Sequence, residues 1–199
     1  MISILLNQFT DILATVDLEG EVLARFKNFQ NYLVVSGGDI KPTPPRGLHI
    51  SLSRFNMVSS RKIGELKRAL DNLYFEDFKI KMGSCLIRPS LENPQTIWVK
   101  VSENVKQLRR LAIEINKLAI QSGFKPVRGG FDQWVKIAEI KSVRDAGPLR
   151  AAVHRLMNVR AGSMHVNTVK LKQEIFSMGL ITYKTIHEIK AMGSTRFLP

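Results

Sequence analysis

The chain has 199 residues, of which 44% are hydrophobic, and these values suffice for one folded domain with its own core. They argue against a disordered tail or a fibre, and no apolar run approaches the length of a membrane-spanning helix. The one cysteine, Cys85, excludes an internal disulfide and a thiolate metal cluster built from this chain alone. We therefore expect an unprocessed intracellular protein, cytoplasmic or nuclear, with no membrane partner.

Positive charge is the strongest feature of the composition. Thirty Lys and Arg residues stand against 17 Asp and Glu residues, which gives a net charge of +13. Such a balance attracts polyanions, and nucleic acid is a better candidate than a membrane surface or an acidic protein. The cations are spread through periodic segments such as 61–68 and 106–110, which predicts a basic folded surface instead of a basic tail.

Hydrophobic periodicity predicts an order of elements that is roughly repeated. The first half predicts a strand (11–17), a helix (18–33), a loop (36–47), a strand (48–55), a helix (60–73) and a strand (78–87). The second half predicts a strand (96–101), a helix (102–122), a loop (125–130), a strand (131–140), a helix from Asp145, and two strands (166–172 and 180–189). No linker divides the two halves, so we expect one domain over residues 1–199, with residues 1–10 as an N-terminal extension.

One strand carries a pair of side chains suited to phosphate chemistry. In Leu48–Phe55 the apolar residues alternate with His49, Ser51 and Ser53, which places His49 and Ser51 on the same face. An imidazole and a hydroxyl together can bind and protonate a phosphoryl oxygen. A polar strand face with these residue types is also commonplace and is usually only solvated.

With its surroundings, this pair resembles the first motif of the 2H phosphoesterases, a superfamily whose members carry two His-x-Ser/Thr motifs. These proteins include RNA ligase-like 2′,3′-cyclic phosphodiesterases, U6 RNA 3′-end exonucleases and viral 2′,5′ phosphodiesterases. DILATVDLEGEVLARF is similar to their opening strand and helix, GLHISLSRF to their first motif, and TIWVKVSENVKQLRRLAIEINKLAIQSGFKP to their middle strand, helix and exit loop. The resemblance implies an α+β bilobal fold, with two pseudo-symmetric lobes of antiparallel sheet and outer helices around a central cleft.

The second motif of the superfamily is degenerate here. The matching segment, FDQWVKI, has Trp134 in place of the second His and Lys136 in place of the Ser or Thr. The resemblance implies that two histidines divide the proton transfers on a phosphodiester, without metal or cofactor, while the hydroxyls hold the phosphate. His49 and Ser51 are then the retained catalytic motif, and a chain with His49 alone is expected to be slow or inactive.

Several residues are candidates for what remains of the function. Lys136 could pair with a phosphate, or replace a proton carrier if it lost its proton near neutral pH. Trp134 could stack on a base or simply plug the cleft, and Arg54 and Arg128 are further candidates for RNA contact. His165 could lean towards the vacated position, although a plain core or surface role is the simpler interpretation; His154 and His187 are unassigned.

Three functions therefore remain open. The first is an RNA-binding pseudoenzyme that holds a strand or an end without cutting it. The second is an active, metal-independent RNA phosphodiesterase that uses His49 with Lys136 or His165. The third is a structural subunit of a larger ribonucleoprotein or viral assembly, in which His49, Ser51 and Lys136 have little importance. The sequence gives no indication of the oligomeric state or of the RNA linkage.

Overall fold

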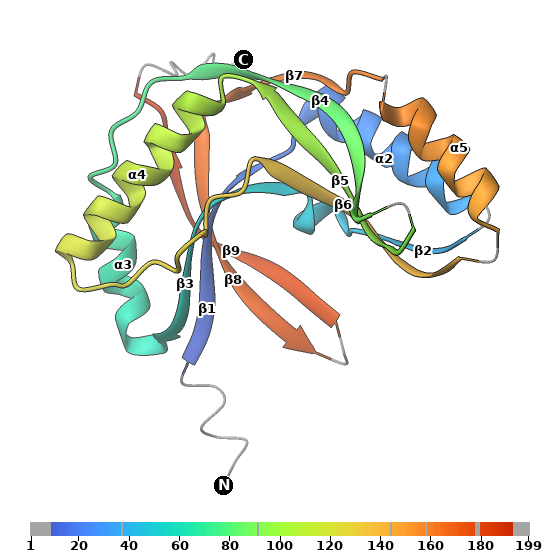
Figure 1. Ribbon diagram of the computed structural model, residues 1–199. Coiled ribbons are helices and arrows are strands. Elements are labelled where there is room, and N and C mark those ends of the chain that lie inside the picture. Colours follow the sequence, from blue (N-terminus) through green and yellow to red (C-terminus); the bar gives the residue numbers. More distant parts are fainter. Residues whose placement is uncertain are drawn as a thin grey trace, which may run out of the picture.

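Two antiparallel sheets form the frame of the computed structural model, which describes residues 9–36, 38–90, 92–143, 145–157, 159–177 and 180–192 (Figure 1). The first sheet has the order β3 (His49–Ser59), β1 (Phe9–Asp17), β8 (Thr168–Ser177) and β9 (Leu180–Lys190). The second has the order β2 (Gly38–Pro42), β6 (Trp134–Val143), β5 (Pro94–Glu103), β4 (Phe78–Pro89) and β7 (Gly162–Val166). The α+β fold with two antiparallel lobes is thus confirmed.

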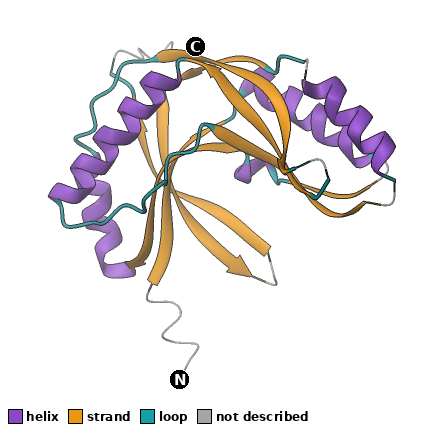
Figure 2. Ribbon diagram, in the orientation of Figure 1, coloured by secondary structure: helices purple, strands orange, loops and turns teal. Residues whose placement is uncertain are grey.

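The helices lie on the outside of the two sheets, in two pairs (Figure 2). They are α2 (Gly20–Val34), α3 (Ile63–Leu70), α4 (Val105–Gln121) and α5 (Ala146–Met157), with short 3₁₀ turns at Pro45–Gly47 and Ser60–Lys62. The helix α2 follows β1 of the first sheet but packs on β2 and β7 of the second. The helix α4 follows β5 of the second sheet but packs on β3 of the first. Each sheet is therefore covered by a helix that the other sheet supplies, which ties the lobes together.

Alternation along the central strands separates the core from the inner faces of the sheets. In β3, Ile50 and Leu52 are buried, and in β5, Ile97 and Val99 are buried. The side chains between them, such as Trp98, are only half-buried, because they lie on the opposite face of the strand. This pattern leaves polar and aromatic side chains on the concave faces that the two sheets turn towards each other.

Two predicted segments differ from the structure. The predicted loop 36–47 contains the strand β2, which pairs with β6 at the edge of its sheet. Its glycines and prolines hide the alternation, and Ile40 is its one fully buried residue. The predicted strand 166–172 is divided at Asn167, because the chain leaves the second sheet after Val166 and enters the first at Thr168.

Among the described residues, none of the helices combines the length and the apolar character needed to cross a bilayer.

Candidate active site

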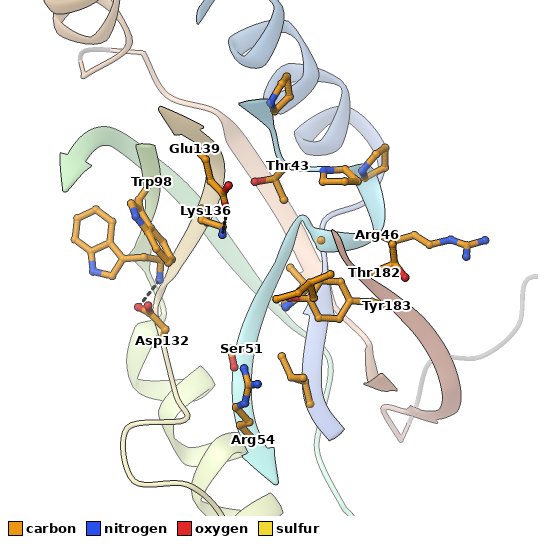
Figure 3. Close-up of a pocket in the computed structure, with 18 of the residues that line it drawn as sticks. Thr43, Arg46, Ser51, Arg54, Trp98, Asp132, Lys136, Glu139, Thr182 and Tyr183 are labelled. Carbon is orange, nitrogen blue, oxygen red and sulfur yellow. Dashed lines mark hydrogen bonds and ion pairs between the residues drawn. The ribbon is translucent and has the colours of Figure 1, made fainter. Parts of the chain in front are cut away.

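A cavity of about 1030 Å³ lies where the two sheets face each other. Its lining comes from β1, β3 and β9 of one sheet, from β2, β5 and β6 of the other, and from the loops that lead into β3 and β6. Its charged, imidazole and aromatic lining residues are Lys41, Arg46, His49, Arg54, Trp98, Asp132, Trp134, Lys136, Glu139, Lys141 and Tyr183. Figure 3 shows Lys136 and Trp98 on one side of this cavity and Arg46 and Tyr183 on the other. The retained and the degenerate motif thus line the same space.

The retained motif lies at the start of β3. His49 is the backbone partner of Asp17 in β1, and its ring meets the Tyr183 ring edge-on, with the centroids 5.0 Å apart. Two residues on, the Ser51 hydroxyl donates a hydrogen bond to the carbonyl oxygen of Gly130 at 2.8 Å. The hydroxyl proton of Ser51 is therefore used within the protein, and Ser51 must exchange this partner before it can donate to a phosphate.

His49 is held in its neutral form. Burial lowers its pKa from 6.5 to about 4, and the positive charge of Lys172 acts in the same direction. Its Nδ1 atom is buried and has no hydrogen-bond partner among the described residues. A buried polar atom without a partner is unfavourable.

A buried ion pair between Lys172 and Asp17 lies next to His49. The Lys172 side chain of β8 is only 2% exposed, and its Nζ lies 2.5 Å from a carboxylate oxygen of Asp17. The same ammonium donates a hydrogen bond to the carbonyl oxygen of Arg46 at 2.7 Å. Lys172 therefore fixes the turn before His49 while its charge favours the neutral imidazole.

Lys136, in the second motif, is paired within the protein. Its Nζ donates to one carboxylate oxygen of Glu139 at 2.9 Å, and Lys141 donates to the other at 2.9 Å. Both hydrogen bonds lower the pKa of Glu139, to about 2, so the carboxylate stays charged at neutral pH. The Lys136 ammonium also helps to lower the pKa of His49, which shows that the two side chains lie near each other. Lys136 is thus on the cavity wall, with its charge partly neutralised by Glu139.

Trp134 forms part of an aromatic wall. The Arg88 guanidinium lies 4.9 Å from the centroid of the Trp134 ring and 4.9 Å from that of Trp98, and Lys100 lies 5.6 Å from Trp134. The Trp98 indole is fixed further, because its Nε1 donates to the Thr96 hydroxyl at 2.8 Å. Trp134 is therefore packed against cations of its own sheet, Arg88 of β4 and Lys100 of β5.

The loop before β6 joins the two motifs through backbone contacts. The amide of Asp132 donates to the carbonyl of Ser51 at 2.9 Å, and the amide of Val127 donates to the carbonyl of Arg54 at 2.8 Å. Gly130 lies so close to β3 that an added Cβ would be 2.9 Å from the Arg54 nitrogen. A side chain at this position would push the loop away, so the sequence RGG allows the close approach.

The other predicted candidates lie in different places. Arg54 lines the cavity, but its guanidinium is paired with Asp11 at 2.7 Å and with Glu174 at 3.2 Å. Arg128 is exposed and is not part of the lining, although its neighbours Val127 and Gly129 are. His165 is paired with Asp77 at 2.7 Å on β7, outside the lining, so it does not occupy the vacated position.

The remaining histidines also lie outside the lining. His187 is paired with Asp71 at 2.6 Å, and His154 lies on α5. Within the described ranges, His49 is accordingly the only imidazole in the cavity. No cluster of three or more metal-ligating side chains occurs there either.

The sequence interpretation missed several residues of the site. Trp98 alternates with buried residues in TIWVKV, so its place on the inner face could have been predicted from the period of the strand. Asp132 belongs to the degenerate segment, but the sequence alone assigned it no role. In the structure its carboxyl lines the cavity, and burial raises its pKa. Lys172 had no local signal, because its partner Asp17 lies on a strand far away in the sequence.

Comparisons with known proteins find relatives that are named as phosphodiesterases. The chain is 28% identical to an RNA 2′,3′-cyclic phosphodiesterase of Aeropyrum pernix over 175 residues, which cover 88% of this chain and 99% of that protein. It is 26% identical to one of Methanothermobacter thermautotrophicus over 160 residues, with 79% and 86% covered. The sequence matches none of the protein-family profiles with which it was compared.

Solved structures share the fold at lower identity. A Thermus thermophilus protein superimposes with a TM-score of 0.70 at 17% identity, covering 90% of this chain and 97% of the other. LigT of E. coli in complex with 3′-AMP gives a TM-score of 0.68 at 16% identity, with 93% and 99% covered. The sequence likeness to these phosphodiesterases and the shared fold support the resemblance of the chain to the 2H phosphoesterase superfamily.

Proposed function

We propose that this chain is an RNA-binding 2H phosphoesterase-like protein whose phosphodiesterase activity is impaired because Trp134 and Lys136 replace the second motif. The observation that carries the proposal is the make-up of the cavity. Among the described residues it contains one imidazole, His49, and the position across from it holds a stacked indole and an ion-paired ammonium. The proposal places the protein in an intracellular compartment, where RNA is available.

Binding of RNA is supported by the charge and the polar groups of the cavity. Lys41, Arg46, Lys136 and Lys141 line it and offer positive charge to a phosphate. Four curated relatives are named RNA 2′,3′-cyclic phosphodiesterases, which makes RNA the first candidate among polyanions.

Impaired catalysis follows from proton transfer. Hydrolysis of a 2′,3′-cyclic phosphate forms a bond from water to phosphorus and breaks the bond to the 2′ or 3′ oxygen. One group must take the proton of the water, and another must protonate the departing oxygen. His49, with a pKa of about 4, can accept a proton at neutral pH, but no second imidazole of the described residues lies in the cavity to donate one. Loss of one proton carrier lowers the rate by on the order of 10² to 10⁴.

A second function, active RNA phosphodiesterase, is favoured by one observation. The neutral form of His49 suits a general base, and Lys136 and Asp132 line the same cavity as titratable groups. If one of them delivered the second proton, turnover would survive. The ion pair between Lys136 and Glu139 argues against Lys136 in this role, since the ammonium is already held by a carboxylate of the protein.

The test measures binding and turnover side by side. Parent protein, His49→Ala and the control His154→Ala are given a short RNA ending in a 2′,3′-cyclic phosphate and a 2′,5′-linked oligoadenylate at low salt. We expect the parent to bind RNA and to hydrolyse neither substrate faster than His49→Ala does. Turnover that is present in the parent and in His154→Ala but absent from His49→Ala would overturn the impairment. A parent that neither binds nor cleaves would overturn the RNA function and favour a structural role in a larger assembly.

A further inference from the structure

The wall formed by Trp98, Arg88 and Trp134 has the properties of a base-stacking site. Trp98 and Trp134 belong to neighbouring strands, β5 and β6, and both line the cavity. Arg88 of β4 lies against both rings, so three adjacent strands contribute one side chain each. The contacts of Arg88 with the two indole rings are separate from the hydrogen bond of Ser51 and from the ring contact of His49.

The two rings differ in how they are covered. Arg88 and Lys100 both lie against Trp134, at 4.9 Å and 5.6 Å from its centroid. Arg88 is the cation that contacts Trp98 within the described ranges, and the Trp98 indole is held by its hydrogen bond to Thr96. Both rings line the cavity, but two cations lie against Trp134 and one against Trp98, so Trp98 is the less covered of the two.

The position of Trp98 relative to the phosphate groups fits a nucleotide. Trp98 is the backbone partner of Lys136, so the indole stands beside the ammonium that is a candidate for phosphate contact. Figure 3 shows Trp98 and Lys136 next to each other on the same side of the cavity. If a phosphate lies near Lys136 and His49, the base of the neighbouring nucleotide can therefore lie beside Trp98.

We propose that Trp98, backed by Arg88 and Trp134, stacks one unpaired base of a single-stranded RNA whose phosphate lies at His49 and Lys136. This inference rests on the proposed RNA-binding function and names its ligand more closely. The indole is already fixed by Thr96 and Arg88, so little ordering is needed on binding. A base within a duplex has both faces covered by its neighbours, so the site selects single strands or ends. Stacking is possible with every base, and we expect weak sequence preference.

The chain offers a direct signal for this test. It contains two tryptophans, Trp98 and Trp134, so all intrinsic tryptophan fluorescence comes from the wall. Binding is measured with a labelled single-stranded oligoadenylate and with a strand of the same length in which the bases are absent. The proteins are the full chain, Trp98→Leu, and the matched Trp98→Phe, which keeps an aromatic face.

We expect the oligoadenylate to bind about tenfold more tightly than the abasic strand and to quench the tryptophan fluorescence. Trp98→Leu should lose about tenfold for the oligoadenylate and nothing for the abasic strand, whereas Trp98→Phe should retain most of the affinity. Equal affinity for both strands, or equal losses in Trp98→Leu and Trp98→Phe, would overturn base stacking while the RNA-binding function stands. Binding of neither strand by the parent would overturn the proposed function itself.

Discussion

At the scale of single residues, the cavity combines a neutral imidazole with an ion-paired ammonium. His49 is neutral because burial and Lys172 disfavour its charged form, and Lys136 is paired with Glu139. The state of His49 and the pairing of Lys136 each lead to a testable prediction.

The lowered pKa of His49 predicts that stability falls with acid. Above pH 6.5 the ring is neutral in both the folded and the unfolded chain; between pH 6.5 and about 4 the unfolded chain takes up a proton that the folded chain does not. The free energy of unfolding should therefore fall by about 2 kcal/mol between pH 7.5 and 4.5 through this group. Denaturant unfolding of parent and His49→Gln at both pH values measures it. Identical losses in the two proteins would contradict the account.

Glu139 is predicted to restrain Lys136. In Glu139→Gln the carboxylate no longer competes for the ammonium, so the affinity for RNA should rise about threefold to tenfold. The control is Glu103→Gln, which removes the same charge from a surface pair with Lys81 outside the cavity lining. Anisotropy titrations at one salt concentration compare the three proteins. An equal gain in both variants would show that only net charge matters.

The sequence predicts some residues of the site and not others, for a physical reason. His49, Ser51, Trp134 and Lys136 were found because a strand period and a family motif are local patterns. The ion pair of Lys136 with Glu139 was not predicted, because residues three apart in a regular strand point to opposite faces. The pairing of β5 with β6 is irregular between Ile97 and Trp98, and this irregularity lies between Lys136 and Glu139 on β6.

At the scale of elements, the loop before β6 sets the distance between the motifs. It is attached to β3 by backbone hydrogen bonds from Val127 and Asp132, and Gly130 allows this approach. The sequence predicted a loop at 125–130 but not its contact with β3. The edge strand β2 was missed altogether, because its pairing with β6 depends on a tertiary contact and not on its own pattern.

Gly130→Ala should disturb both stability and binding. The new Cβ would lie 2.9 Å from the backbone nitrogen of Arg54 and 3.2 Å from the carbonyl oxygen of Val127, so backbone must move. We expect a loss of about 1 to 3 kcal/mol in the free energy of unfolding and weaker RNA binding. The control is Gly64→Ala on α3, where the nearest atom is the end of the Arg68 side chain at 3.8 Å. Thermal unfolding of both variants checks this, and an unchanged Gly130→Ala would refute the packing argument.

At the scale of the whole molecule, the duplicated order of elements was readable from periodicity, and the bilobal fold followed from resemblance. The exchange of α2 and α4 between the sheets was not predicted, since nothing in a helix pattern says which sheet it covers. The net charge of +13 was also readable from the sequence, but the pairing of the cations was not. Arg54 lines the cavity and is paired with two carboxylates, those of Asp11 and Glu174, whereas Lys136 and Lys141 share the single carboxylate of Glu139. The charge that faces the cavity is therefore a property of the fold.

The central claim is that the fold and the retained motif are intact and that two substitutions impair the chemistry. It is tested most directly by restoring the second motif in the variant Trp134→His with Lys136→Thr. Turnover of an RNA ending in a 2′,3′-cyclic phosphate is measured for the parent, for this variant, and for the variant with His49→Ala added. We predict a gain on the order of 10² or more in the restored variant, which disappears again without His49. A folded restored variant that is no faster than the parent would contradict the account.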